Sequence, residues 1–132
     1  HEHLFASYGD MLRSLAEDPS GKVREADLRR FEKALLQELG YGLTLDRDSE
    51  GRALHAEAYY TYRMEEGPVR VEHAEAAPQV VRGKTLLDLA GDDFADSRSR
   101  AEAKQLMRSL MAYYLSGTEL TTRKIFKELQ DL

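Results

Sequence analysis

The clearest hydrophobic pattern in the chain is a leucine-rich stripe with the period of an α-helix. Its apolar residues recur three and four positions apart: Leu28, Phe31, Leu35 and Leu39. Leu36 lies beside this stripe. Most of the intervening charged residues fall outside the stripe. Gly40 follows at the position where a helix needs a left-handed residue to end. The pattern predicts an amphipathic helix over about Val23–Leu39 whose stripe faces a core.

Four further segments have helical patterns. Residues 3–16 carry a broad apolar face and are expected to pack as an antiparallel pair with the leucine-rich helix. Lys84–Ala90 predicts a short helix ending at Gly91. A long helix is expected from an N-cap at Asp96 or Ser97 to about Leu115, and a last one from Thr121 or Thr122. The apolar side of the long helix is expected to comprise Leu106, Met107, Leu110, Met111, Tyr113 and Tyr114.

The helical period is absent between Leu43 and Val81. Ala58–Arg63 is rich in strand-forming residues, Met64–Gly67 supplies a turn, and Val69–Val71 alternates as a return strand. Pro68 is tolerable at the start of that strand because it removes only a terminal donor. These features predict a β-hairpin insertion over about 58–72, followed by a loop. The fold class is therefore expected to be mostly α, as a single compact helical domain over residues 1–132 with a small β-hairpin insertion.

Composition narrows the classes of protein to which the chain could belong. It has 132 residues, a net charge of −5 and no cysteine, which excludes disulfides and thiolate metal sites. No apolar run approaches the roughly 18 to 20 residues of a membrane span, so a soluble protein without membrane contact is expected. Residues 44–96 hold six basic and twelve acidic side chains (net −6), whereas residues 97–127 hold seven basic and two acidic ones (net +5). A polyanion should therefore meet the C-terminal third.

No residue constellation predicts catalysis. The chain has four histidines, and they lack metal-ligand spacing on a common helix: His1, His3, His55 and His73. The acidic residues match no calcium loop, and the sequence contains no phosphate-binding glycine loop and no serine elbow. We therefore expect no enzyme, no metal and no cofactor. Tyr60 and Tyr62 share one face of the predicted hairpin and Tyr59 lies on the other. They could fill a core or stack on nucleobases, and the negative surroundings favour the core.

Two basic features are candidates for binding. Arg29 and Lys33 lie four residues apart beside the leucine stripe and in line with Leu36, so they are either a solvated flank or the cationic edge of a groove. At such a flank, replacing Arg29 by alanine should hardly change stability. The other feature is a basic stripe on the long helix, formed by Arg100, Lys104 and Arg108, with three more basic residues beyond the helix: Arg123, Lys124 and Lys127. These residues form either a solvated face or a contact with DNA.

Two motifs carry a resemblance to a known family. Leu-Arg-Arg-Phe-Glu at 28–32 precedes Leu-Gly-Tyr at 39–41, and Tyr-Leu-x-Gly-x-x-Leu-x-x-Arg-x-x-Phe runs from Tyr114 to Phe126. Together they resemble the C-terminal helical portion of the bacterial DNA repair protein family RecO, of the proteobacterial type. The resemblance implies that an oligonucleotide-binding barrel precedes this region. Many RecO proteins bind zinc through four cysteines after Leu-Gly-Tyr, but Gly42–Gly51 has none, which implies the zinc-free branch and a hairpin held by its tyrosines.

The resemblance also implies a function. RecO proteins of the RecF pathway bind and anneal single-stranded DNA, contact RecR and help to load RecA, without catalysing a covalent step. They dock the acidic, phenylalanine-ended C-terminal tail of single-stranded DNA-binding protein in this helical region, and the first arginine of the motif matches Arg29. Arg30 and Lys33 would add charge and Leu36 an apolar floor, in a bacterial cytoplasmic, nucleoid-associated protein. The alternatives are a direct DNA-binding helical module and a scaffold that presents the hairpin.

Overall fold

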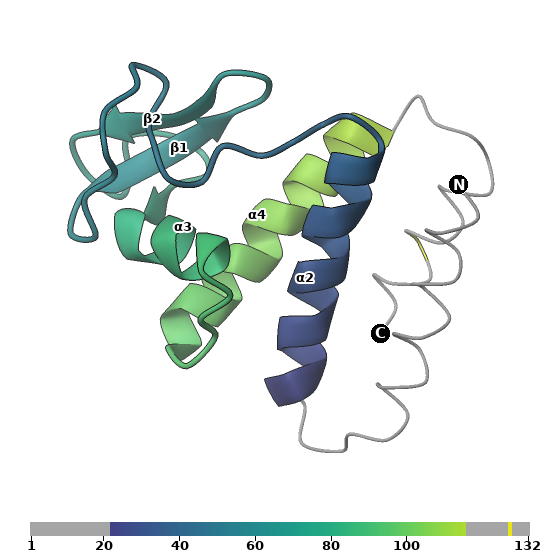
Figure 1. Ribbon diagram of the computed structural model, residues 1–132. Helices are drawn as coiled ribbons and strands as arrows, with labels where there is room; N and C mark the ends of the chain where they lie inside the picture. The colour runs from purple at the N-terminus through teal and green to yellow at the C-terminus, as the bar shows by residue number, and fades with distance from the viewer. Residues whose placement is uncertain (1–21, 116–126, 128–132) are drawn as a thin grey trace. The chain divides into compact units, whose positions relative to one another are not determined.

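The computed structural model describes residues 22–115 and residue 127 (Figure 1). Along the chain the elements are α2 (Lys22–Glu38), β1 (Tyr59–Arg63), β2 (Gly67–Val71), β3 (Val81–Arg82), α3 (Gly83–Ala90) and α4 (Ser97–Leu115). The described part is thus mostly α with one small antiparallel sheet, which confirms the predicted fold class. The helices predicted over residues 3–16 and from Thr121 lie outside the described residues.

The chain divides into two compact units. Residues 1–42 and 107–132 form one unit, and residues 43–106 form the other. The division falls within α4, so each unit receives one part of that helix. The prediction of a single domain over residues 1–132 stays a prediction.

The first unit contains α2, whose leucine stripe is buried as its spacing predicts. Four of the stripe residues are between 0% and 8% exposed, namely Leu28, Phe31, Leu35 and Leu36. Gly40 adopts a left-handed φ of 90°. Its N–H donates to the carbonyl of Gln37 over 3.0 Å, and the N–H of Tyr41 donates to that of Leu36 over 2.7 Å. These two bonds satisfy two of the last carbonyls of the helix, and Gly40 ends α2 as predicted.

The same unit contains the C-terminal part of α4. Met107, Leu110 and Met111 are fully buried, in agreement with the predicted apolar side, but Tyr113 is 48% exposed. The prediction for Tyr113 was wrong because this position, although it lies three residues after Leu110, falls at the edge of the helix face that Met107 and Tyr114 share. The Tyr114 ring stacks on Tyr41, with centroids 4.9 Å apart and an interplanar angle of 25°.

The second unit contains the sheet, in the order β2-β1-β3. The predicted hairpin is confirmed, because β1 and β2 pair antiparallel with Arg63 opposite Gly67. Pro68 lies on the edge strand β2, and its carbonyl accepts a hydrogen bond from the N–H of Ser49 over 2.7 Å. The strand β3, which places Val81 opposite Tyr60, lies between the segment 72–80 expected as a loop and the helix expected from Lys84, and was not predicted. A strand of two residues carries no period that a sequence pattern could reveal.

Tyr60 is the centre of this unit. It is 1% exposed, which assigns it to the core, and its hydroxyl accepts a hydrogen bond from the N–H of His55 over 2.9 Å. Gly83, the first residue of α3, packs against the same place: a Cβ there would lie 1.8 Å from the His55 carbonyl oxygen and 3.0 Å from the Tyr60 ring. Only glycine allows α3 to begin so close to the 55–60 segment, and α3 lies beside the sheet in Figure 1.

Candidate functional site

The site predicted from the motif lies on α2, where Arg29, Glu32 and Leu36 fall on one face. All three are buried: Arg29 and Glu32 are 5% exposed and Leu36 is 0% exposed. The Nε of Arg29 donates to Oε1 of Glu32 over 2.5 Å. The Nη1 of Arg29 lies 4.0 Å from Oε2 of Glu25, which is an ion pair at long range and too far for a hydrogen bond.

Burial dominates the electrostatics of this face. It raises the pKa of Glu32 above the usual 4.5, although the charge and hydrogen bond of Arg29 act in the opposite direction. Glu25 raises that pKa further, and Arg108 of α4 lowers it. Within the described part of the chain, Nη1 of Arg29 is buried without a hydrogen bond. A buried donor left in this way costs stability until a partner reaches it.

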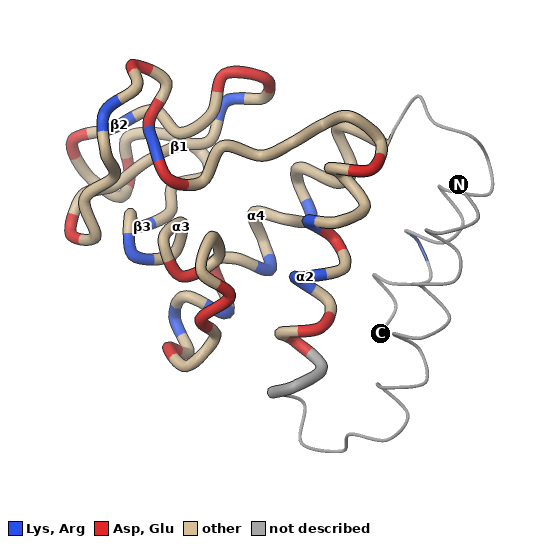
Figure 2. Tube along the Cα trace, viewed as in Figure 1, with Lys and Arg blue, Asp and Glu red and all other residues tan. Residues whose placement is uncertain are grey.

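The arrangement differs from the exposed cationic edge that the sequence predicted. Arg29 is inside, and Leu36 is too deeply buried to be the open floor of a groove. The Arg30 side chain is 50% exposed and pairs with Asp27 over 3.3 Å, and Lys33 is half-buried. Basic and acidic residues alternate along α2 in Figure 2. The roles of Arg29, Arg30, Lys33 and Leu36 in binding a peptide stay predictions.

Sequence reasoning missed Glu32. Its position is four residues after Leu28 and four before Leu36, so its spacing placed it on the buried stripe. The expectation that charged residues face water hid this signal. An arginine three residues earlier, within reach of an ion pair along the helix, was the sign that a buried glutamate could be accommodated.

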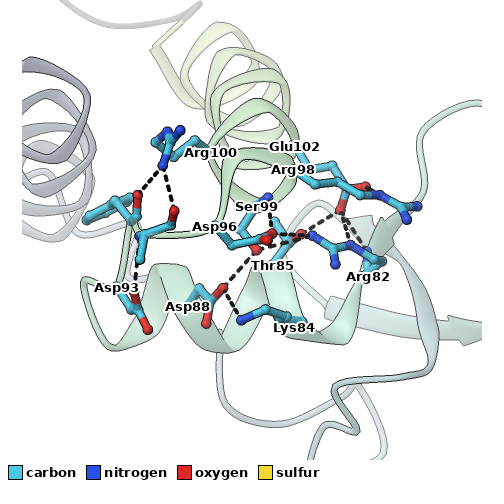
Figure 3. Close-up of polar contacts among 12 residues, drawn as sticks. Arg82, Lys84, Thr85, Asp88, Asp93, Asp96, Arg98, Ser99, Arg100 and Glu102 are labelled. Atoms are coloured by element: carbon cyan, nitrogen blue, oxygen red, sulfur yellow. Dashed lines mark hydrogen bonds and ion pairs between the residues drawn. The ribbon is translucent and has the colours of Figure 1, made fainter. Parts of the chain in front are cut away.

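The basic stripe of α4 is the second predicted site. Nη1 of Arg100 donates to the carbonyls of Phe94 and Ala95, over 2.7 and 2.9 Å, and so fastens the loop before the helix (Figure 3). Lys104 and Arg108 are half-buried, and Lys127 is exposed. Arg123 and Lys124 lie outside the described residues. The DNA-binding role of these six residues stays a prediction. The two hydrogen bonds of Arg100 already give this residue a structural role.

A polar network in the second unit joins β3, α3 and the start of α4 (Figure 3). Arg82 donates from Nη2 to Oδ2 of Asp96 over 2.9 Å, and from its backbone N–H to Oε1 of Glu102 over 3.1 Å. Thr85 donates to the same Glu102 oxygen over 2.5 Å. Burial alone would raise the pKa of Glu102, but these hydrogen bonds lower it. The network therefore holds charges whose partners are all within the unit, which is typical of a structural role.

Other kinds of site receive no support from residues 22–115 and 127. Within them no three His, Cys, Asp or Glu side chains are grouped so as to bind a metal ion. The same residues contain no helix that combines the length and the apolar character required to cross a bilayer.

Comparison with known proteins identifies what the chain resembles. The family model described as "Recombination protein O C terminal" matches residues 1–124. A DNA repair protein RecO of Dechloromonas aromatica (strain RCB) is 70% identical over 132 residues, which are 100% of this chain and 54% of the relative. The DNA repair protein RecO of Azoarcus sp. (strain BH72) is 42% identical over 136 residues, 100% of this chain and 55% of the relative. The chain thus spans about half the length of the curated relatives it matches.

Proposed function

The chain belongs to the RecO family, through the C-terminal domain of recombination protein O, and on this premise we propose that it serves DNA repair and recombination by docking a partner protein. The partner is single-stranded DNA-binding protein, and the docked segment is its acidic C-terminal tail, which ends in phenylalanine. The resemblance of residues 28–32 to the RecO motif supports this choice. The domain catalyses no covalent step, and in the whole protein it supports contact with RecR, RecA loading and strand annealing.

One observation carries the proposal: Nη1 of Arg29 is buried without a hydrogen bond in the described part of the chain. Proteins pair almost all of their buried polar groups, because an unmade bond costs about 1 to 3 kcal/mol. The terminal carboxylate of a peptide is a suitable missing acceptor, since arginine and carboxylate form charge-assisted hydrogen bonds. The position of Arg29 as the first arginine of the motif points to the same residue.

Binding then proceeds in two stages. Because Arg29 is 5% exposed, the peptide cannot reach it without a shift of the side chains that cover it. Arg30, with a half-exposed side chain, and Lys33 lie on the same helix and attract the acidic residues of the tail first. Arg29 then anchors the carboxylate, and the same shift of side chains admits the terminal aromatic ring to the apolar surroundings of Leu36.

The alternative function, direct DNA binding through the stripe of α4, has weaker support. Two donor contacts of Arg100 are made with backbone carbonyls. Arg108 acts electrostatically on the carboxylate of Glu32. The first feature occupies a donor of the stripe and the second offsets part of its charge, and the net charge of −5 opposes DNA as well.

Calorimetric titration of the 132-residue chain with an acidic peptide ending in phenylalanine tests the proposal. The parent should bind, with an affinity that falls as salt is added, because part of the attraction is between charges. The same peptide with an amidated C-terminus, or without its last phenylalanine, serves as the matched control and should bind at least tenfold more weakly, a loss of about 1.4 kcal/mol. If all three peptides bind alike, or none binds, the proposed function is wrong.

A further inference from the structure

The guanidinium of Arg29 has two sides in different surroundings. Its Nε–H side is held by Glu32 over 2.5 Å, and both side chains are 5% exposed. Nη1 lies on the opposite side of the planar group and is buried without a hydrogen bond among the described residues. The carboxylate of Glu25, 4.0 Å away, gives Nη1 only a distant ion pair.

A guanidinium is planar and rigid, so holding one nitrogen fixes the direction in which the others point. Lysine has no such division, because its single ammonium group would turn toward Glu32. A free arginine side chain loses rotamer entropy when it is immobilised by a ligand, and this loss weakens binding. If the ion pair within α2 has already ordered the side chain, a ligand does not have to supply this cost.

We propose that Glu32 is a positioning residue for peptide binding: it holds Nε of Arg29 so that Nη1 is presented to the carboxylate of the docked tail. This inference rests on the proposed function and adds a residue to it. Glu32 does not touch the ligand, and it acts through the orientation of Arg29. The burial of the ion pair strengthens the effect, because a hydrogen bond out of contact with water is not weakened by competition.

The opposite role for Glu32 is also conceivable, because Glu32 and the peptide carboxylate are both anions. In that role the glutamate competes with the peptide for Arg29. The two roles differ in what they predict for Glu32→Gln. Its amide oxygen still accepts the hydrogen bond from Nε, although the negative charge is gone. Positioning predicts that Glu32→Gln binds about as well as the parent and that Glu32→Ala binds about tenfold more weakly. Competition predicts that both variants bind more tightly.

The test is peptide titration of the 132-residue chain with variants at both positions, each first checked for folding by circular dichroism. Arg29→Lys keeps the positive charge and an ion pair with Glu32, and should bind about tenfold more weakly because no second nitrogen remains for the ligand. Arg52→Lys makes the same exchange at an exposed position outside α2 and is the matched control, which should bind as the parent does. In the Arg29→Lys background, Glu32→Gln should give no rescue.

These outcomes separate the inference from the proposed function. If the parent fails to bind the peptide, the proposed function is overturned, and the inference falls with it. If the parent binds and Arg29→Lys binds equally well, only the inference is overturned. Tighter binding by a folded Glu32→Ala variant also overturns it. Should Glu32→Ala fail to fold, Glu32→Gln still decides between the two roles, because tighter binding than that of the parent would overturn the inference.

Discussion

Nη2 of Arg82 donates to Oδ2 of Asp96 over 2.9 Å, and this ion pair ties β3 to the residue that caps α4. The same carboxylate oxygen accepts the N–H of Ser99 over 2.8 Å, as an N-cap does. These hydrogen bonds, that of Arg82 first, lower the pKa of Asp96 to about 2 from its usual 3.8. Asp96 therefore stabilises the fold in its charged form.

The first prediction concerns stability in acid. Because the pKa of Asp96 is lowered in the folded chain, the contribution of its carboxylate to stability is complete above pH 3.8. This contribution disappears as the pH falls toward about 2. Asp96→Asn keeps an N-cap but loses the ion pair with Arg82. In urea unfolding, the parent should be more stable than this variant at neutral pH, and the difference should shrink across that range. Asp46→Asn removes the same charge from an exposed position and should show no such narrowing.

The second prediction concerns Gly83. A methyl group there would lie 1.8 Å from the carbonyl oxygen of His55, so Gly83→Ala must displace the backbone of the 55–60 segment or the start of α3. Overpacking of a core typically costs about 1 to 3 kcal/mol, which outweighs the helix propensity gained from alanine. Chemical denaturation should show this loss. Gly42→Ala is the control, because no atom lies within 4 Å of its added methyl and the backbone there is not left-handed. Equal stability of both variants would contradict this account.

The elements that could be predicted from sequence are those determined by neighbouring residues. The stripe of α2, its end at Gly40 and the turn before Gly67 depend on periods and backbone preferences that a short segment contains. The N-cap of α4 is equally local, and the structure selects Asp96 over Ser97. For the same reason the hairpin between β1 and β2 was found close to its predicted bounds.

What could not be predicted depends on residues far apart in the sequence. The strand β3 exists because Val81 and Arg82 meet β1, some twenty residues earlier in the chain. The ion pair of Arg82 with Asp96 and the approach of Gly83 to His55 belong to the same class. Arg29 and Glu32 are different, since each carries a charge that favours water by itself. Only their pairing, together with burial from elsewhere in the fold, places them inside.

The third prediction tests that buried pair by stability. Its burial changes the expectation, drawn from the sequence, that replacing Arg29 hardly affects folding. Arg29→Met and Glu32→Met each leave one buried charge without its partner, which costs up to about 3 to 5 kcal/mol. The double variant leaves neither charge and fills the space with apolar side chains, so it should be more stable than either single variant. Thermal and urea unfolding of the four proteins provide the cycle. Simple additivity of the two losses would show that the residues do not act as a pair.

The last prediction separates structure from DNA binding on α4. The chain should bind single-stranded DNA only weakly at physiological salt, because its net charge is −5 and the donor contacts of Arg100 are made with the carbonyls of Phe94 and Ala95. Arg100→Ala should lower the free energy of unfolding by about 1 kcal/mol or more and leave DNA affinity unchanged. Lys127→Ala, at an exposed position, is the comparison. If Lys127 contacts a phosphate, this variant should reduce the salt dependence of DNA binding by about one ion without affecting stability. Fluorescence anisotropy at several salt concentrations, with melting curves, measures both. Low-nanomolar binding, or loss of DNA affinity in a stably folded Arg100→Ala, would make α4 a DNA-binding surface in its own right.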